Sequence, residues 1–211
     1  MKYKDREEFV IANIQKYKKE KNNYLDIGFV GEYEKPFMHY EILNTLNSND
    51  GLVGLDINSK IENIENDVNI KPYLEQVKYK KESIFDSNEE GFDIVTLLEV
   101  FEHLPHPYLA LHKIYDKLNT NGTFLLTYPN PLNIGIFYRY ILRKNILDKG
   151  FLKIYKGADD HKVFPMPPCM VIYLEDLGFE VKEVSYIKGK LNKIPFLDKF
   201  SDYIGIVAVK K

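Results

Sequence analysis

The chain of 211 residues contains a single cysteine and no long apolar run. One cysteine excludes a framework of intrachain disulfides and is typical of proteins from a reducing compartment. No stretch approaches the ~20 apolar residues that a membrane-spanning helix needs. The first residues, "MKYKDREEFVIANIQKYKKEK", are charged throughout and lack the apolar core of an export signal. We therefore expect a cytoplasmic protein without a membrane span.

An excess of one charge sign is missing as well. The chain has 29 basic and 31 acidic residues and a formal net charge of -2. This balance creates no overall field that would attract nucleic acid or anionic lipid, so we expect no nucleic-acid partner. The composition is that of an ordinary globular protein, and the length suits one domain over residues 1–211. Nothing in the sequence indicates the oligomeric state.

Glycine is scarce where a nucleotide-binding turn would need it, in the stretch "LDIGFVGEYEKPF". An apolar strand leads into Asp26, and only Gly28 and Gly31 follow. The dinucleotide fingerprint needs G-x-G-x-x-G, and the Gly-Lys-Ser/Thr of a P-loop is absent. Asp26 would also place a carboxylate beside a bound pyrophosphate, which is electrostatically unfavourable. The turn therefore argues against a ligand rich in phosphate.

Strand and helix patterns alternate along the chain, which is typical of a parallel sheet with helices on its faces. An amphipathic helix is predicted over 5–20. Predicted strands are "NYLDIGF", "GLVGLDIN", "VKYKK", "FDIVTLLEV" and, after an "NTNG" turn, "TFLLTYPNP". The last two, "GFEVKEVSYI" and "DYIGIVAVKK", are separated by a loop too short for a crossover helix, so they should form an antiparallel pair.

Polar side chains lie at the predicted carboxyl ends of these strands, where open parallel sheets bind their ligands. They are Asp26, Asp56, Glu99 and Tyr128. S-adenosylmethionine suits such a set, because it carries no phosphate and both its sulfonium and its α-ammonium are positive. Asp56 is placed to accept hydrogen bonds from both ribose hydroxyls, as an acid at this position does in dinucleotide folds.

Five stretches together resemble the class I S-adenosylmethionine-dependent methyltransferases over roughly residues 22–131. They are "YLDIGFVGE", "GLVGLDIN", "ESIFD", "FDIVTLLEVFEHLPHP" and "GTFLLTYPNP". The resemblance implies a Rossmann-like α/β fold. In it, a mostly parallel seven-stranded sheet with an antiparallel last strand forms the middle of a three-layer αβα sandwich. It also implies S-adenosylmethionine as the cofactor and a small molecule, lipid or sugar as the acceptor, with transfer to oxygen slightly favoured.

The resemblance further implies a role for each matching residue. Asp26, Gly28 and Gly31 would line the methionine portion of the cofactor, Asp56 the ribose, Ile57, Glu82, Ser83 and Ile84 the adenine, and Leu98 and Glu99 the floor beneath it. Where the family usually has G-x-G-x-G, this chain has Gly28, Val30 and Glu32. That departure leaves open an alternative, a non-catalytic methyltransferase-like protein with a binding or regulatory role.

Two histidines are candidate catalytic bases, because their ordinary pKa range suits proton transfer from a hydroxyl. His103 lies in "FEHLPHP", after the fourth predicted strand, and His161 lies in "GADDHKVF". His103 could instead brace its loop, and His161 could be a solvated loop residue. Asp159 and Asp160 precede His161, but three adjacent residues rarely converge on one ion and no spaced partner is evident, so no metal site is predicted.

The stretch 131–168 interrupts the regular alternation and contains the aromatic, basic run "FYRYILRKN". Inserts of this kind often carry function, and we predict a lid or substrate-facing segment here. The lone Cys169 follows in "FPMPPCMV", where a packed structural thiol is expected.

Overall fold

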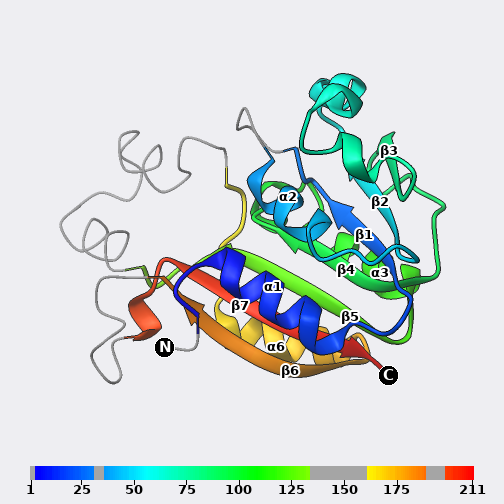
Figure 1. Ribbon diagram of the computed structural model, residues 1–211. Coiled ribbons are helices and arrows are strands. Elements are labelled where there is room, and N and C mark those ends of the chain that lie inside the picture. The colour runs from blue at the N-terminus through cyan, green and yellow to red at the C-terminus, as the bar shows by residue number, and fades with distance from the viewer. Residues whose placement is uncertain (1–2, 31–35, 134–160, 189–197) are drawn as a thin grey trace.

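The computed structural model describes residues 3–30, 36–133, 161–188 and 198–211 (Figure 1). Within them, seven strands form one sheet in the order β3-β2-β1-β4-β5-β7-β6. The strands are β1 (Asn23–Ile27), β2 (Gly51–Asp56), β3 (Val77–Lys81), β4 (Phe92–Leu98), β5 (Leu118–Pro129), β6 (Phe179–Ile187) and β7 (Tyr203–Lys210). The predicted mostly parallel sheet is confirmed.

Strands β3, β2, β1, β4 and β5 are parallel neighbours, and β7 runs antiparallel to both β5 and β6. The predicted antiparallel terminal pair is therefore confirmed. Strand β4 explains why the central strands read as apolar runs: it is covered on both faces, as parallel strands usually are. In the register of β1 with its two neighbours, Asp26 lies opposite Gly54 of β2 and Thr96 of β4.

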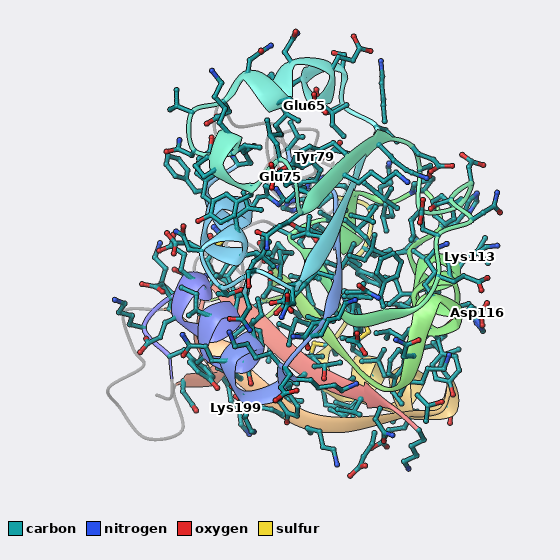
Figure 2. The ribbon with its side chains drawn as sticks, turned by 45° about the vertical axis from the view of Figure 1, so that its right-hand side comes forward. Glu65, Glu75, Tyr79, Lys113, Asp116 and Lys199 are labelled. Carbon is teal, nitrogen blue, oxygen red and sulfur yellow. The ribbon has the colours of Figure 1, made fainter. Side chains whose placement is uncertain are left out.

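Helices cover both faces of the sheet and make the predicted three-layer sandwich (Figure 1). They are α1 (Arg6–Tyr17), α2 (Phe37–Leu43), α3 (Pro107–Lys117) and α6 (Pro167–Asp176), with 3-10 helices η1 (Ser59–Asn66), η2 (Lys71–Tyr73), η3 (Phe101–His103) and η4 (Asp198–Phe200). Apolar residues of α1, α2 and η1 share one core cluster, and those of α3 and α6 share the other. In Figure 2, Lys113 and Asp116 lie on α3 at the outer side of the second layer.

Two predicted boundaries differ from the observed ones. Helix α1 ends at Tyr17 rather than at residue 20. Strand β5 begins at Leu118, directly after α3, because Leu118 already pairs with Phe92 of β4. The "NTNG" stretch is therefore an irregularity within β5, where Asn121 adopts a φ of 63°, and not a turn that precedes the strand.

The predicted insert 131–168 is only partly described, because residues 134–160 lie outside the described ranges. Residues 161–166 form neither helix nor strand, and α6 begins at Pro167, inside the predicted boundary. Cys169 is exposed on the first turn of α6, so the expectation of a packed thiol was wrong; its neighbour Met170 faces the core instead. Within the described ranges, no helix combines the length and apolarity needed to cross a bilayer.

Candidate functional site at the carboxyl edge of the sheet

Three acidic residues lie at the carboxyl ends of adjacent parallel strands. Asp26 is the second-last residue of β1, Asp56 is the last residue of β2, and Glu99 directly follows β4. Strands β2 and β3 are added on one side of β1, and β4 is added on the other side, so the strand order reverses between β1 and β4. Ligands of open α/β sheets bind outside the strands at such a switch point. The acids therefore surround the place where this fold binds a ligand.

Asp26 belongs to a buried hydrogen-bond network. Its Oδ1 accepts from the Thr96 hydroxyl at 2.6 Å, and its Oδ2 lies 2.7 Å from Nδ1 of His39 on α2. Nε2 of His39 lies 2.8 Å from the Tyr79 hydroxyl, and burial raises the pKa of Tyr79, which keeps that hydroxyl protonated. The consistent assignment is that Tyr79 donates to Nε2 of His39 while Nδ1–H donates to Asp26. Figure 2 labels Tyr79 on β3.

Gly28 makes the turn that follows β1. Its φ is +71°, its N–H donates to the Leu55 carbonyl at 2.7 Å, and a Cβ there would lie 2.5 Å from Cγ2 of Val100. Both the conformation and the close approach require glycine. Gly31, the second predicted glycine contact, lies outside the described residues.

Val30, which replaces a glycine of the family motif, is accommodated by the core. Its side chain is buried in the apolar cluster beneath α1 and α2, and its N–H donates to Oδ2 of Asp56 at 2.8 Å. The preceding Phe29 packs against His39, with ring centroids 4.3 Å apart, and against Tyr79 at 5.3 Å. The side chains of Phe29 and Val30 therefore pack on the face of the sheet that α2 covers.

Asp56 is largely buried and held by two backbone donors. Its Oδ2 accepts from Val30 and its Oδ1 from the N–H of Asn58, each at 2.8 Å. A carboxylate offers about four acceptor sites, so each oxygen can take one more hydrogen bond. The next residue, Ile57, has an exposed fraction of 73%. An acid with acceptor capacity beside an exposed apolar side chain matches what a ribose and its attached base require.

Residues 82–84 connect the end of β3 to this edge. The N–H of Glu82 donates to the Asp56 carbonyl at 3.1 Å, which ties the two strand ends together. Glu82 and Ser83 are half-buried, whereas the side chain of Ile84 packs in the core cluster shared with α3. The side chain of Ile84 therefore serves the core, and Glu82 and Ser83 are the side chains nearer the surface.

Glu99 has a strained backbone and a half-buried side chain. Its φ is +56°, its N–H donates to the Thr127 carbonyl at 3.0 Å, and its Oε2 lies 3.5 Å from the guanidinium of Arg6. Within the described part of the chain, its buried Oε1 has no hydrogen-bond partner. Burial raises the pKa of Glu99 to about 7, while the nearby positive charge of Arg6 acts in the opposite direction. Leu98 precedes it and is half-buried at the end of β4.

These features fit S-adenosylmethionine. The unsatisfied Oε1 of Glu99 and the acidic surroundings suit a cationic ligand, and Asp56 suits a ribose. The glycine turn at Gly28 brings the backbone close to Val100, which follows Glu99, and so joins the ends of β1 and β4. The same carboxylates would repel a polyanionic dinucleotide.

The two predicted catalytic histidines lie side by side. The ring centroids of His103 and His161 are 4.7 Å apart, although 58 positions separate the residues in sequence. Between them lies the carboxylate of Glu102, which has an exposed fraction of 1%. The N–H of Lys162 donates to the Glu102 carbonyl at 2.7 Å, and its Nζ donates to the His103 carbonyl at 2.8 Å. Lys162 thereby holds the segment of His161 against η3.

Sequence reasoning missed His39, Arg6, Glu102 and Lys162. His39 lies on α2, 13 positions after Asp26, and Arg6 lies on α1, far from Glu99 in sequence. Neither belongs to a motif, so nothing in the sequence connected them to these acids. Glu102 is the exception, because it directly precedes His103 in "FEHL", and an acid beside a histidine is a recognisable signal.

Comparison with known proteins agrees with the fold and the strand-end motifs. Residues 3–183 match the family described as "Methyltransferase domain" (Methyltransf_23). The ubiquinone biosynthesis O-methyltransferase of Pseudoalteromonas translucida is 24% identical over 124 residues, which are 59% of this chain and 49% of that protein. The protein of that name from Pseudomonas putida strain GB-1 is 26% identical over 112 residues, 52% of this chain and 47% of its own. The chain thus spans about half the length of these curated relatives.

Solved structures share the fold at low sequence identity. A SAM-dependent methyltransferase from Archaeoglobus fulgidus superposes with a TM-score of 0.59 at 19% identity, covering 97% of this chain and 94% of its own. The cyclase SpnF superposes with a TM-score of 0.64 at 11% identity, covering 96% of this chain and 80% of its own. Such likenesses establish the fold alone, whereas the family match extends over most of the chain. The chain belongs to the methyltransferase domain family.

Proposed function

We propose that this enzyme transfers a methyl group from S-adenosylmethionine to a hydroxyl oxygen of a small molecule or lipid. The observation that carries the proposal is a set of three acids at the switch point, in a chain that belongs to the methyltransferase domain family: Asp26 and Asp56 are buried, and Glu99 is half-buried. The negative charge of these carboxylates favours a nucleoside that carries a positive sulfonium group. S-adenosylmethionine, when bound, supplies an already activated methyl group.

In this proposal, Asp56 accepts hydrogen bonds from the ribose hydroxyls and Ile57 lies against the adenine, with Glu82 and Ser83 at its edge. Glu99 and Asp26 face the methionine portion and favour its α-ammonium. The exposed fraction of 73% at Ile57 supports this assignment, because a bound base would remove that apolar surface from water.

The acceptor is proposed to be a hydroxyl for two reasons. The curated relatives are named O-methyltransferases, although the chain covers only about half of their length. In addition, His103 and His161 lie together just beyond the end of β4, where a base would be needed to remove a hydroxyl proton. Amine acceptors need no such base, so the histidine pair favours oxygen.

The test is a titration of the purified protein with S-adenosylhomocysteine and, separately, with NAD, followed by calorimetry and thermal shift. We expect saturable binding of S-adenosylhomocysteine and none of NAD. Binding of NAD alone would overturn the cofactor assignment. Binding of S-adenosylhomocysteine without turnover on any hydroxyl acceptor would favour the non-catalytic alternative.

Two variants sharpen this test. Asp56→Ala should weaken S-adenosylhomocysteine binding by about 2 kcal/mol, because hydrogen bonds to a charged group are lost. The matched control is Asp93→Ala, since Asp93 also accepts from a backbone N–H and a lysine, but at the amino end of the sheet. Asp93→Ala should lower stability and leave the affinity unchanged. Equal affinities of the two variants would place the ribose elsewhere.

A further inference from the structure

We propose that Glu102, His103 and His161 form a binding site for one divalent transition-metal ion, of the kind that accepts imidazole and carboxylate ligands. One ligand atom from each of these side chains lies within 4.8 Å of the other two. The site was not predicted from sequence, because only the adjacent residues Asp159 and Asp160 were considered as partners of His161.

The distances suit ligands around an ion better than direct hydrogen bonds. Oε1 of Glu102 lies 3.9 Å from Nε2 of His103 and 4.0 Å from Nε2 of His161, beyond hydrogen-bond range. Bonds of about 2.0–2.2 Å to one ion place neighbouring ligand atoms roughly 3–3.5 Å apart in tetrahedral or octahedral geometry. Small side-chain rotations would bring the three atoms to that spacing.

The backbone positions the ligands from two distant segments. Glu102 and His103 come from η3 after β4, and His161 comes from the segment before α6. The two hydrogen bonds of Lys162 to the carbonyls of Glu102 and His103 join these segments. The ring of Phe164 packs against that of His161, with centroids 5.4 Å apart, and fixes its orientation further. The contacts of Lys162 and Phe164 therefore hold the two segments that carry the ligands in place.

The donor set indicates the kind of ion. Two imidazoles and one carboxylate are typical of Zn²⁺, Fe²⁺ or Mn²⁺, and three protein ligands leave a coordination position open, as in catalytic sites. Burial of Glu102 and half-burial of the histidines strengthen the interaction with a cation relative to an exposed cluster. The net charge of a divalent ion with one carboxylate and two neutral imidazoles is +1.

The functional role rests on the proposed methyl transfer to a hydroxyl. The acceptor oxygen takes the open position, where the ion lowers its pKa, and its proton leaves to water. The oxygen lone pair then forms the bond to the methyl carbon as the carbon–sulfur bond breaks, and neutral S-adenosylhomocysteine leaves. His103 and His161 thus act as ligands in this arrangement, and the ion takes over the work of a base.

The experiment uses the full chain, stripped with EDTA and then dialysed. It is titrated with Zn²⁺ alone by calorimetry and with Co²⁺ alone by visible ligand-field absorption. We expect one equivalent of each ion to bind per chain. The variants Glu102→Gln and His161→Asn should each weaken binding by about 10- to 100-fold or more, the loss that even residues orienting a metal ligand produce.

The matched control is His112→Asn, which removes an exposed histidine of α3 outside the cluster and should leave metal affinity unchanged. Circular dichroism checks the fold of each variant. Wild-type protein that binds neither ion would overturn the proposal whatever the variants do. So would equal affinities of wild type, Glu102→Gln and His161→Asn.

Binding of S-adenosylhomocysteine is measured on the same samples to separate the two proposals. If that ligand binds and metal does not, the metal site fails and the methyl-transfer proposal stands. If metal binds at the cluster and S-adenosylhomocysteine does not, the proposed function fails and the metal site stands.

Discussion

His39 holds the carboxylate of Asp26, the first acid of the site, in a buried hydrogen bond. The ring is fully buried and joins the carboxylate of Asp26 to the hydroxyl of Tyr79. A buried carboxylate that loses its donor carries the cost of desolvation without compensation. The network therefore contributes both to stability and to the orientation of Asp26.

We expect His39→Ala to lower the free energy of unfolding by at least about 2 kcal/mol, because Asp26 loses a partner and a cavity remains. Tyr79→Phe removes only one hydroxyl and should cost about 1 kcal/mol. Urea denaturation measures both. His112→Ala, at an exposed position, serves as the control and should change stability by less than about 0.5 kcal/mol. A loss at His39 no larger than at His112 would contradict the network.

Glu99 makes the stability depend on pH. Burial raises its pKa from 4.5 to about 7, so the folded state holds the proton more tightly than the unfolded state. Stability from this group is then present below pH 4.5 and is lost as the pH rises through about 7. The loss is on the order of 3 kcal/mol.

Glu99→Gln should remove this dependence. Between pH 4.5 and 7 the variant gains stability relative to wild type, and the difference is largest above pH 7. Arg6→Gln should have the opposite effect, because the guanidinium favours the charged form; the decline in stability then extends to higher pH. Denaturation curves in EDTA across this range measure the effect. Parallel curves for wild type and Glu99→Gln would show that burial does not perturb this carboxyl.

At the scale of elements, α1 approaches the sheet over a glycine of β7. A Cβ at Gly205 would lie 2.8 Å from Cζ of Phe9 on α1 and 2.7 Å from Cδ1 of Ile187 on β6. Phe9 and Ile187 are both fully buried, so neither has free space to retreat into. Because Arg6 lies one turn from Phe9, this packing also sets where Arg6 meets Glu99.

Gly205→Ala should therefore cost about 1–3 kcal/mol through overpacking. Gly51→Ala in β2 is the matched control, since its nearest neighbour would be 3.6 Å away, an ordinary contact. That variant should stay within about 0.5 kcal/mol of wild type. Thermal or urea unfolding compares them. Equal costs at the two glycines would mean that the contact between α1 and β7 is loose.

At the scale of the whole molecule, one sheet serves both cores. The cluster under α1 and α2 and the cluster under α3 and α6 lie on opposite faces of the same strands. Strand β5 contributes Leu125 to the first and Phe124 to the second. Because both helical layers pack on the same strands, we expect the two cores of the described residues to unfold together; one domain over residues 1–211 stays a prediction.

We expect a single cooperative transition in urea, with the change in far-UV circular dichroism coinciding with the change in tyrosine fluorescence. The 16 tyrosines and the absence of tryptophan make tyrosine emission the natural second probe. Two separated transitions would show that the chain contains more than one folding unit.

Much of this fold could be predicted from local patterns. The strands around Asp26, Asp56 and Glu99 were recognisable because buried parallel strands read as apolar runs that end in a polar residue. The start of β5 was missed because the pairing of Leu118 with Phe92 is a long-range contact that overrides the turn preference of "NTNG". Cys169 was misplaced because the helical phase of α6 turns Met170, and not its neighbour, to the core.

The strand ends, their acids and Gly28 follow from local patterns, because hydrophobic periodicity and turn chemistry depend on neighbouring residues. The side chains that complete the site depend on how separate segments pack. His39 meets Asp26, Arg6 meets Glu99, and His161 meets Glu102 and His103 through the packing of separate segments on one sheet. The spacing of these residues in the sequence does not predict the contacts. The segments are brought together by the sheet order and, for His161, by two hydrogen bonds from Lys162.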